Sequence, residues 1–125
     1  MKMKILVVDD EALLVKGIRF NLQNEGYEVI TGSDGLEAVQ AVQTQHPDLV
    51  VLDVMMPNMD GVSATRAIRA LARADAKTIP IIAMTANAFD EDAKACFEAG
   101  MNAHLAKPFQ MEKVVAVIAQ FCRKA

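Results

Sequence analysis

The chain has 125 residues, of which 53% are hydrophobic, and its formal net charge at pH 7 is −3. This length fits one compact domain with its own core, and no apolar run approaches the roughly 18 residues of a membrane span. The acidic balance, without a basic stripe, argues against direct nucleic-acid binding by this chain.

Two further features favour a cytoplasmic location. The apolar run at the N-terminus leads directly into Asp9 and Asp10, so it is too short and too acidic at its end for a signal peptide. Cys96 and Cys122 lie in separate helical patterns without the spacing of metal ligands. We therefore expect two reduced, partly buried thiols, as is usual in cytosolic domains.

Short apolar runs alternate with helical patterns along the whole chain. In chain order, we expect a strand at 3–8, a helix at 11–25, a strand at 27–31, a helix at 34–45, a strand at 48–52, a helix at 62–74, a strand at 81–85, a helix at 88–99, a strand at 103–106 and a helix at 110–123. Gly26 and Gly100 follow two of these helices as expected stops, and Asp60 with Gly61 should cap the third helix.

This alternation predicts an α/β fold of the doubly wound, flavodoxin-like (βα)5 type. Its five-stranded parallel sheet should carry helices on both faces. The strand order 2-1-3-4-5 is expected by analogy with known folds of the flavodoxin-like type. In such sheets, ligands bind at the carboxyl ends of the strands, near the point where the strand order reverses. The first and third strands would be neighbours at this point.

Polar side chains stand where these strands end. The first strand leads into Asp9 and Asp10, the third ends at Asp53, the fourth ends at Thr85, and the fifth is followed by Lys107. Because parallel strands end at one edge of a sheet, we expect the three aspartates to share one pocket, with Thr85 and Lys107 on its rim.

Three carboxylates in one pocket repel one another and call for a cation. Oxygen ligands favour a hard ion, so we expect Mg²⁺, or the similarly hard Mn²⁺. The charges of the three aspartates, one divalent ion and Lys107 sum to zero. Such a pocket would stabilise a phosphoryl group, and a carboxylate beside the metal could serve as the nucleophile that forms an aspartyl-phosphate.

Four short motifs now suggest a family. They are VVDDE at 7–11, LDVMMPNMDG at 52–61, MTA at 84–86 and AKPF at 106–109, in this order and at strand ends. Over essentially its whole length, the chain resembles a bacterial response-regulator receiver domain, which implies one receiver domain at 1–125. Residues 1–61 resemble receivers fused to DNA-binding output domains, whereas 74–109 resemble receivers of hybrid sensor kinases, as in a natural hybrid receiver or an excised or recombined domain. We expect either a stand-alone regulator that works by protein contact or a domain of a larger protein.

The resemblance implies roles for the site residues. Asp53 would accept a phosphoryl group from a sensor histidine kinase or a histidine phosphotransfer domain. Asp10, Asp53 and the backbone carbonyl of Met55 would bind Mg²⁺, and Asp9 would hold metal-bound water. Lys107 would contact the phosphoryl group.

The resemblance also implies a conformational switch. The Thr85 hydroxyl would move toward the phosphoryl group, and an aromatic side chain on the fifth strand would turn inward. His104 stands at that aromatic position, and we expect its ring to fill the same slot rather than to sense pH. The surface of the fourth helix, fifth strand and fifth helix would bind partners or form a weak homodimer. The Lys107–Pro108 peptide bond is expected to be cis.

Two positions tune phosphate lifetime in such receivers, and here they are Met55 and Asn87. Neither is an obvious acid or base for a hydrolytic water, so we expect modest self-dephosphorylation. Met55, Met56 and Met59 are expected to serve as packing side chains rather than ligands, because Mg²⁺ disfavours thioether sulfur.

Three other functions compete with this interpretation. A dehalogenase-like phosphatase would need a second aspartate two residues after the nucleophile, where Met55 stands. A flavin-binding domain would need a Ser/Thr/Gly-rich loop after the first strand, where the chain has DDEA. A degenerate receiver acting as a scaffold would not need the full set of aspartates, threonine and lysine. We therefore expect a signalling module that assists only its own phosphorylation and dephosphorylation, not a classical enzyme.

Overall fold

The structure is a computed structural model that describes residues 2–72, 74–85 and 91–122. Strands and helices alternate in it as β1 (Lys4–Val8), α1 (Ala12–Asn24), β2 (Glu28–Gly32), α2 (Gly35–Gln45), β3 (Leu49–Asp53), α3 (Gly61–Arg69), β4 (Ile81–Thr85), α4 (Glu91–Ala99), β5 (Ala103–Ala106) and α5 (Met111–Cys122). Within the described part of the chain, none of the helices has the length and apolar character needed to cross a membrane.

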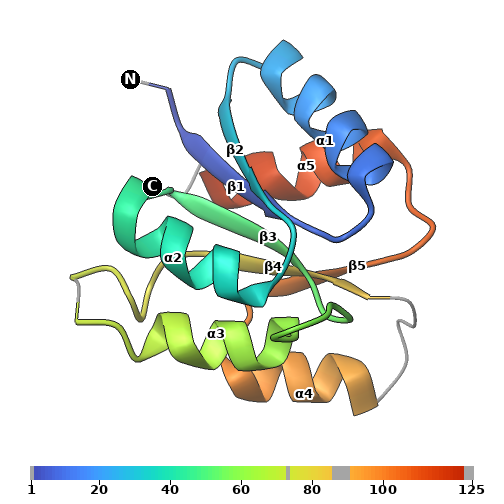
Figure 1. Cartoon of the computed structure of the whole chain (residues 1–125). Coiled ribbons are helices and arrows are strands. Elements are labelled where there is room, and N and C mark those ends of the chain that lie inside the picture. The colour runs from blue at the N-terminus through green and yellow to red at the C-terminus, as the bar shows by residue number, and fades with distance from the viewer. Residues whose placement is uncertain (1, 73, 86–90, 123–125) are drawn as a thin grey trace.

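The five strands form one parallel sheet in the order β2-β1-β3-β4-β5, which confirms the predicted topology. Helices α1 and α5 cover one face of the sheet, and α2, α3 and α4 cover the other (Figure 1). The strand order reverses between β1 and β3, where Val8 pairs with Leu52. The carboxyl ends of these two strands therefore lie next to each other.

The alternation of side chains along each strand divides the core into two clusters. In β1, Leu6 and Val8 belong to the cluster under α2, α3 and α4, whereas Ile5 and Val7 belong to the cluster under α1 and α5. All four side chains are fully buried, as expected for a strand covered on both faces. The two clusters hold the sheet from both sides and fix the position of its carboxyl edge.

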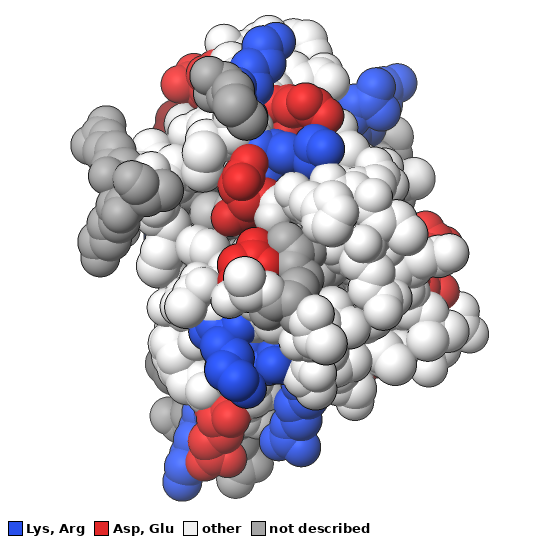
Figure 2. Space-filling view, turned by 90° about the vertical axis from the view of Figure 1, so that its left-hand side faces the viewer, with Lys and Arg blue, Asp and Glu red and all other residues white. Residues whose placement is uncertain are grey.

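The surface carries charges of both signs. On the face shown in Figure 2, lysine and arginine side chains are interspersed with aspartate and glutamate side chains. No patch of a single sign extends across the described part of that face.

Most predicted elements agree with the structure to within one or two residues, but the third helix is shorter than expected. The sequence predicts a helix at 62–74, whereas α3 ends at Arg69. The Arg69 side chain explains this end, because its guanidinium donates hydrogen bonds to the carbonyl oxygens of Gly100 at 2.7 and 3.1 Å and of Ala76 at 3.1 Å. These bonds draw the following segment back to the core, where Ala76 and Ile79 are buried. Part of the helix predicted at 88–99 lies outside the described residues.

Side-chain hydrogen bonds fix the loop between β3 and α3. As predicted, Asp60 caps α3 by accepting a hydrogen bond from the backbone N–H of Ser63 at 2.7 Å. Asn58, which has a positive φ of 66°, donates from Nδ2 to Asp34 at 2.7 Å. Gly61 packs so tightly that a Cβ there would overlap the backbone carbonyl of Asp53 and lie 2.9 Å from the Cα of Val54. The loop is thus built against the end of β3.

We predict that Gly61→Ala lowers the free energy of unfolding by about 1–3 kcal/mol, the usual cost of overpacking. Gly17→Ala is the matched control, because its Cβ would lie 3.6 Å from Met111 Cε, an ordinary contact inside a helix. That control should stabilise the domain by about 0.5–1 kcal/mol through higher helix propensity. Chemical denaturation measures both, and equal effects of the two substitutions would contradict the predicted overlap.

Candidate functional site

The parallel sheet brings the predicted acidic residues together at its carboxyl edge. Asp53 is the last residue of β3, and Asp9 and Asp10 follow β1 on the neighbouring strand. One carboxylate oxygen from each of the three lies within 4.8 Å of the others. The three aspartates are far apart in the chain but form one cluster in space.

Burial raises the free-energy cost of keeping the carboxylates of this cluster charged. Asp9 and Asp53 are 2% and 4% exposed, whereas Asp10 is exposed. Burial, together with the negative charge of Asp9, raises the pKa of Asp53 from 3.8 to about 6, although the positive charge of Lys107 acts in the opposite direction. Asp53 is therefore a carboxylate whose negative charge the protein stabilises incompletely.

Lys107 provides the positive charge of the cluster. Its Nζ atom lies 2.9 Å from Asp9 Oδ2, 3.2 Å from Glu11 Oε1 and 3.5 Å from Asp53 Oδ1. Burial alone would lower the pKa of Lys107, but its hydrogen bonds to Asp9 and Glu11 and the nearby charges of Asp53 and Asp9 raise it above the ordinary value. The ammonium group thus stays charged and bridges three acids.

Strand pairing holds the backbone that carries Lys107. Its N–H donates to the carbonyl of Thr85 at 2.7 Å, which extends the pairing of β4 with β5. The Lys107–Pro108 peptide bond is cis, in agreement with the expectation from the resemblance.

Glu11 is the residue that the sequence analysis left without a role. Its backbone N–H donates to Asp9 Oδ1 at 2.9 Å, and its carboxylate accepts a hydrogen bond from Lys107 Nζ at 3.2 Å. The sequence signal was present, since Glu11 directly follows Asp9 and Asp10. With Glu11 included, four carboxylates, one ammonium and one divalent cation would leave a net charge of −1, so the predicted neutral balance is wrong by one charge.

Thr85 ends β4 beside these groups and is 2% exposed. Among the described residues, its Oγ1 is the one buried side-chain nitrogen or oxygen without a hydrogen-bond partner. Buried hydroxyl groups are normally paired, because an unpaired one costs free energy. The hydroxyl is therefore available to an oxygen that enters the site.

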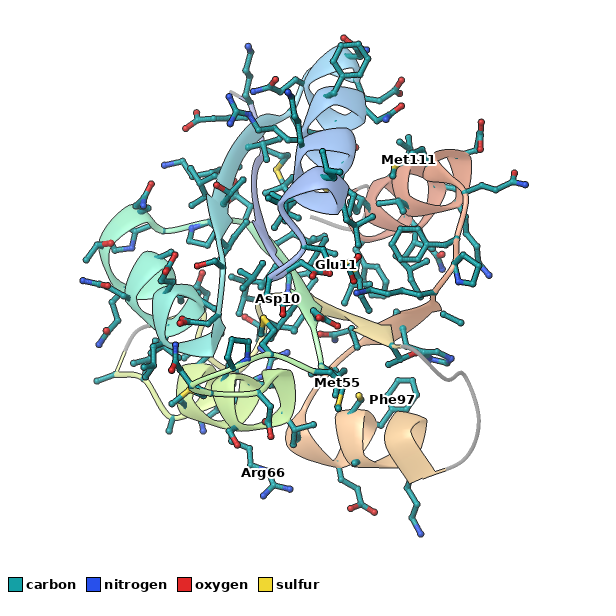
Figure 3. The ribbon with its side chains drawn as sticks, turned by 45° about the vertical axis from the view of Figure 1, so that its right-hand side comes forward. Asp10, Glu11, Met55, Arg66, Phe97 and Met111 are labelled. Atoms are coloured by element: carbon teal, nitrogen blue, oxygen red, sulfur yellow. The ribbon has the colours of Figure 1, made fainter. Side chains whose placement is uncertain are left out.

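The three methionines of the loop after β3 differ in their environments. Met55 is 72% exposed, so the prediction that it serves as packing is wrong, whereas Met56 and Met59 pack against the core as expected. The Met55 N–H donates to Asp53 Oδ1 at 3.4 Å, which places the Met55 backbone beside the carboxylate. In Figure 3 the Met55 side chain points toward Phe97 of α4.

The remaining predicted residues lie on the β5 side of the site. His104 is partly buried, and its ring meets that of Phe97 edge to face, with centroids 6.0 Å apart. Asn87 lies outside the described residues.

The donor set fits a hard divalent cation. Its side-chain ligand atoms are carboxylate oxygens, and such oxygens are what Mg²⁺ and Mn²⁺ prefer. The raised pKa of Asp53 shows that Lys107 alone does not compensate the acids. Both observations make a divalent ion a chemically suitable occupant.

Comparisons with known proteins agree with this arrangement. The family described as response regulator receiver domain matches residues 5–119. The transcriptional regulatory protein PhoP of Bacillus subtilis, which is described as regulating alkaline phosphatase synthesis, is 38% identical over 125 residues, covering 100% of this chain and 50% of that protein. The sensor histidine kinase RcsC of Escherichia coli is 36% identical over 122 residues, covering 98% of this chain and 12% of that protein. The chain therefore spans at most half the length of these two relatives, one a transcriptional regulatory protein and the other a sensor histidine kinase.

Solved structures show the same fold. A receiver domain of a sensor histidine kinase from Pseudomonas aeruginosa is 38% identical, with a TM-score of 0.86 and coverage of 96% of this chain and 97% of that one. That structure is described as having a magnesium ion coordinated in its active-site cleft. The chemotaxis response regulator CheY4 of Vibrio cholerae is 31% identical, with a TM-score of 0.90 and coverage of 96% and 98%.

The match over residues 5–119, the order of the strands and the acidic cluster at their carboxyl ends lead to one conclusion. The chain belongs to the response regulator receiver domain family, whose members are signalling domains of phosphorelays.

Proposed function

We propose that Asp53 accepts a phosphoryl group from a phosphohistidine on a sensor histidine kinase or a histidine phosphotransfer domain. The observation that carries this proposal is the environment of Asp53, a buried carboxylate whose pKa is raised to about 6 between Asp9 and Lys107. A basic carboxylate is a better nucleophile than an ordinary one, and its neighbours are suited to the charge of a phosphoryl group.

The transfer is a substitution at phosphorus. One Asp53 carboxylate oxygen forms a bond to phosphorus while the bond from phosphorus to the histidine nitrogen breaks. The imidazole leaves with that electron pair and takes up a proton, so the products are an aspartyl-phosphate and a neutral histidine. Little other covalent chemistry is required of the protein, which must mainly position the groups and stabilise charge.

Asp9, Asp10, Asp53 and the backbone carbonyl of Met55 would hold Mg²⁺ or Mn²⁺, with Asp9 acting through metal-bound water. When bound, the ion would neutralise charge on the phosphoryl oxygens. The cluster of three carboxylates supports this assignment, and so does the magnesium ion described for the Pseudomonas aeruginosa receiver.

Lys107 and Thr85 would contact the phosphoryl oxygens. Lys107 Nζ already lies 3.5 Å from Asp53 Oδ1, and the unpaired Thr85 hydroxyl can donate a hydrogen bond. Engagement of Thr85 would pull on the end of β4, and His104 would respond on β5. The surface of α4, β5 and α5 would then change for a partner or a second copy, with the half-exposed Phe97 in contact with His104.

Signalling is favoured over turnover of external phosphate esters. A phosphatase with an aspartyl-phosphate intermediate needs a proton donor near the leaving group. Met55, two residues after Asp53, offers only an exposed thioether, which neither donates nor removes a proton at neutral pH.

The direct test is incubation of the protein with acetyl phosphate and Mg²⁺, followed by intact-mass spectrometry. We expect the mass increase of one phosphoryl group, labile at alkaline pH as an acyl phosphate, and none in Asp53→Asn. Beryllofluoride with Mg²⁺ should shift amide resonances around Asp53, Thr85 and Lys107 in the wild type. An unmodified wild type would refute the proposal and favour a scaffold, whereas an equally modified Asp53→Asn variant would show that another residue is the acceptor.

The raised pKa of Asp53 predicts a pH-dependent stability of the metal-free domain. The folded state binds the Asp53 proton more tightly than the unfolded state, so the free energy of unfolding should fall as pH rises from about 4 to 6 and the penalty should persist above that range. Asp53→Asn removes this penalty and should stabilise the metal-free protein at pH 8 by about 2–3 kcal/mol.

The measurement is thermal or chemical unfolding in a chelator at pH 4 and at pH 8. The gain from Asp53→Asn should be small at pH 4, and Glu25→Gln, which changes an exposed acid, should show no such difference. Millimolar Mg²⁺ should stabilise the wild type and reduce the gain, because the ion binds the folded state. A gain that is the same at both pH values would contradict the assigned cause.

Phosphate lifetime tests the role of Met55. Met55→Asn should speed loss of the phosphoryl group several-fold, because an amide can hold the attacking water and a thioether cannot. Leu36→Asn is the control, since it also replaces an exposed apolar side chain, which is 53% exposed on α2. Loss of acyl phosphate in the presence of Mg²⁺ measures the rate, and a wild-type half-life of seconds would contradict the expectation of modest self-dephosphorylation.

A further inference from the structure

Glu11 occupies an unusual position for the residue that precedes a helix. It is the N-cap of α1, but its side chain makes no capping hydrogen bond to the helix. Ser, Thr, Asp and Asn are the residues that commonly accept such a bond at this position, and the longer glutamate is not among them. The Glu11 carboxylate instead lies 3.2 Å from Lys107 Nζ, across 96 residues of sequence.

The contacts of Lys107 show a competition for its ammonium group. Asp9 and Glu11 accept hydrogen bonds from Nζ at 2.9 and 3.2 Å, whereas Asp53 lies farther away at 3.5 Å. An ammonium group has three donors, so each bond to one acid reduces what it offers another. Asp9 is buried and its backbone is tied to β2 by an N–H bond to Gly32, but the Glu11 side chain is 64% exposed. Glu11 is therefore the partner that can release Lys107 at least cost.

We propose that Glu11 is a positioning residue that holds the Lys107 ammonium on the Asp9 side of the site and thereby opposes the loading of an anion on Asp53. This inference rests on the proposed function, in which Lys107 contacts the phosphoryl group. Before an anion can receive the full charge of Lys107, the contact with Glu11 must loosen. Glu11 thus sets how readily the domain enters its phosphorylated state.

The charges around Lys107 support this role. Glu11 adds a fourth carboxylate to the three aspartates, so the site keeps excess negative charge even with a divalent cation bound. The acids share one ammonium group, so removal of the exposed charge of Glu11 would leave more of the charge of Lys107 to an incoming anion. Because Glu11 faces solvent, the effect should be sensitive to salt.

The test compares the affinity of the full chain for beryllofluoride, in the presence of Mg²⁺, between the wild type and Glu11→Gln. Amide resonances in NMR titrations measure the concentration at half saturation. Glu11→Gln should lower this concentration by roughly three- to tenfold, the size expected for one partly screened charge. The gain should shrink in 1 M salt, where the screening length is about 3 Å.

Glu25→Gln is the matched control, because Glu25 lies at the opposite end of α1 and the substitution changes the net charge equally. It should leave the affinity unchanged. Glu11→Ser serves as a second variant that removes the charge and introduces a favourable N-cap residue, and it should reproduce the gain of Glu11→Gln. Without Mg²⁺ or beryllofluoride, Glu11→Gln should also shift the side-chain resonances of Lys107, whereas Glu25→Gln should not.

A double variant separates action through Lys107 from direct repulsion of the anion. In a Lys107→Met background, Glu11→Gln should no longer raise the affinity. The inference is overturned if Glu11→Gln binds beryllofluoride like the wild type, or if its gain persists without Lys107. If the wild type itself binds no beryllofluoride at Asp53, the proposed function fails instead, and that outcome is visible before any Glu11 variant is compared.

Discussion

The site depends on two carboxylates, those of Asp9 and Asp53, that are buried away from water beside the ammonium group of Lys107. A buried charge is costly unless opposite charges and hydrogen bonds surround it. Lys107 contacts both acids, yet the pKa of Asp53 remains raised, because burial and the charge of Asp9 outweigh the lysine. This incomplete compensation destabilises the metal-free fold and, for the same reason, prepares the carboxylate to bind a cation and to act as a nucleophile.

The parallel sheet imposes this arrangement of the acids at its carboxyl edge. Its strands all end at one edge, and the order β2-β1-β3-β4-β5 makes the ends of β1 and β3 neighbours. Apolar clusters on both faces fix the strands, so the acids cannot move apart to relieve their repulsion. The tight packing of Gly61 against the backbone of Asp53 adds a further restraint from the loop side. The stability of the core thus keeps the mutually repelling carboxylates close together.

Particular residues show how far sequence reasoning reaches. The apolar runs and the polar residues that end them predicted the fold and the placement of Asp9, Asp10, Asp53 and Lys107, because strand ends in a parallel sheet have a known common edge. The end of α3 was not predictable from residues 70–74, which suit a helix, because it accompanies tertiary hydrogen bonds from Arg69 to the carbonyl oxygens of Gly100 and Ala76. The exposure of Met55 was equally hidden, because a methionine beside a site suits packing and exposure alike.

The sequence by itself determined the architecture, the strand order through its resemblance to a family, and the set of chemical groups at the carboxyl edge. The architecture and the set of chemical groups follow from periodicity and from the residues at strand ends, which are local features of a chain. Only the tertiary structure decided that Glu11 shares the ammonium group of Lys107. It also decided that the buried Thr85 hydroxyl lacks a hydrogen-bond partner and that the rings of His104 and Phe97 are in contact. Such contacts join residues that are far apart in sequence, as Glu11 and Lys107 are. They depend on distances of a few ångströms, because hydrogen bonds and Coulomb interactions are sensitive to differences of that size.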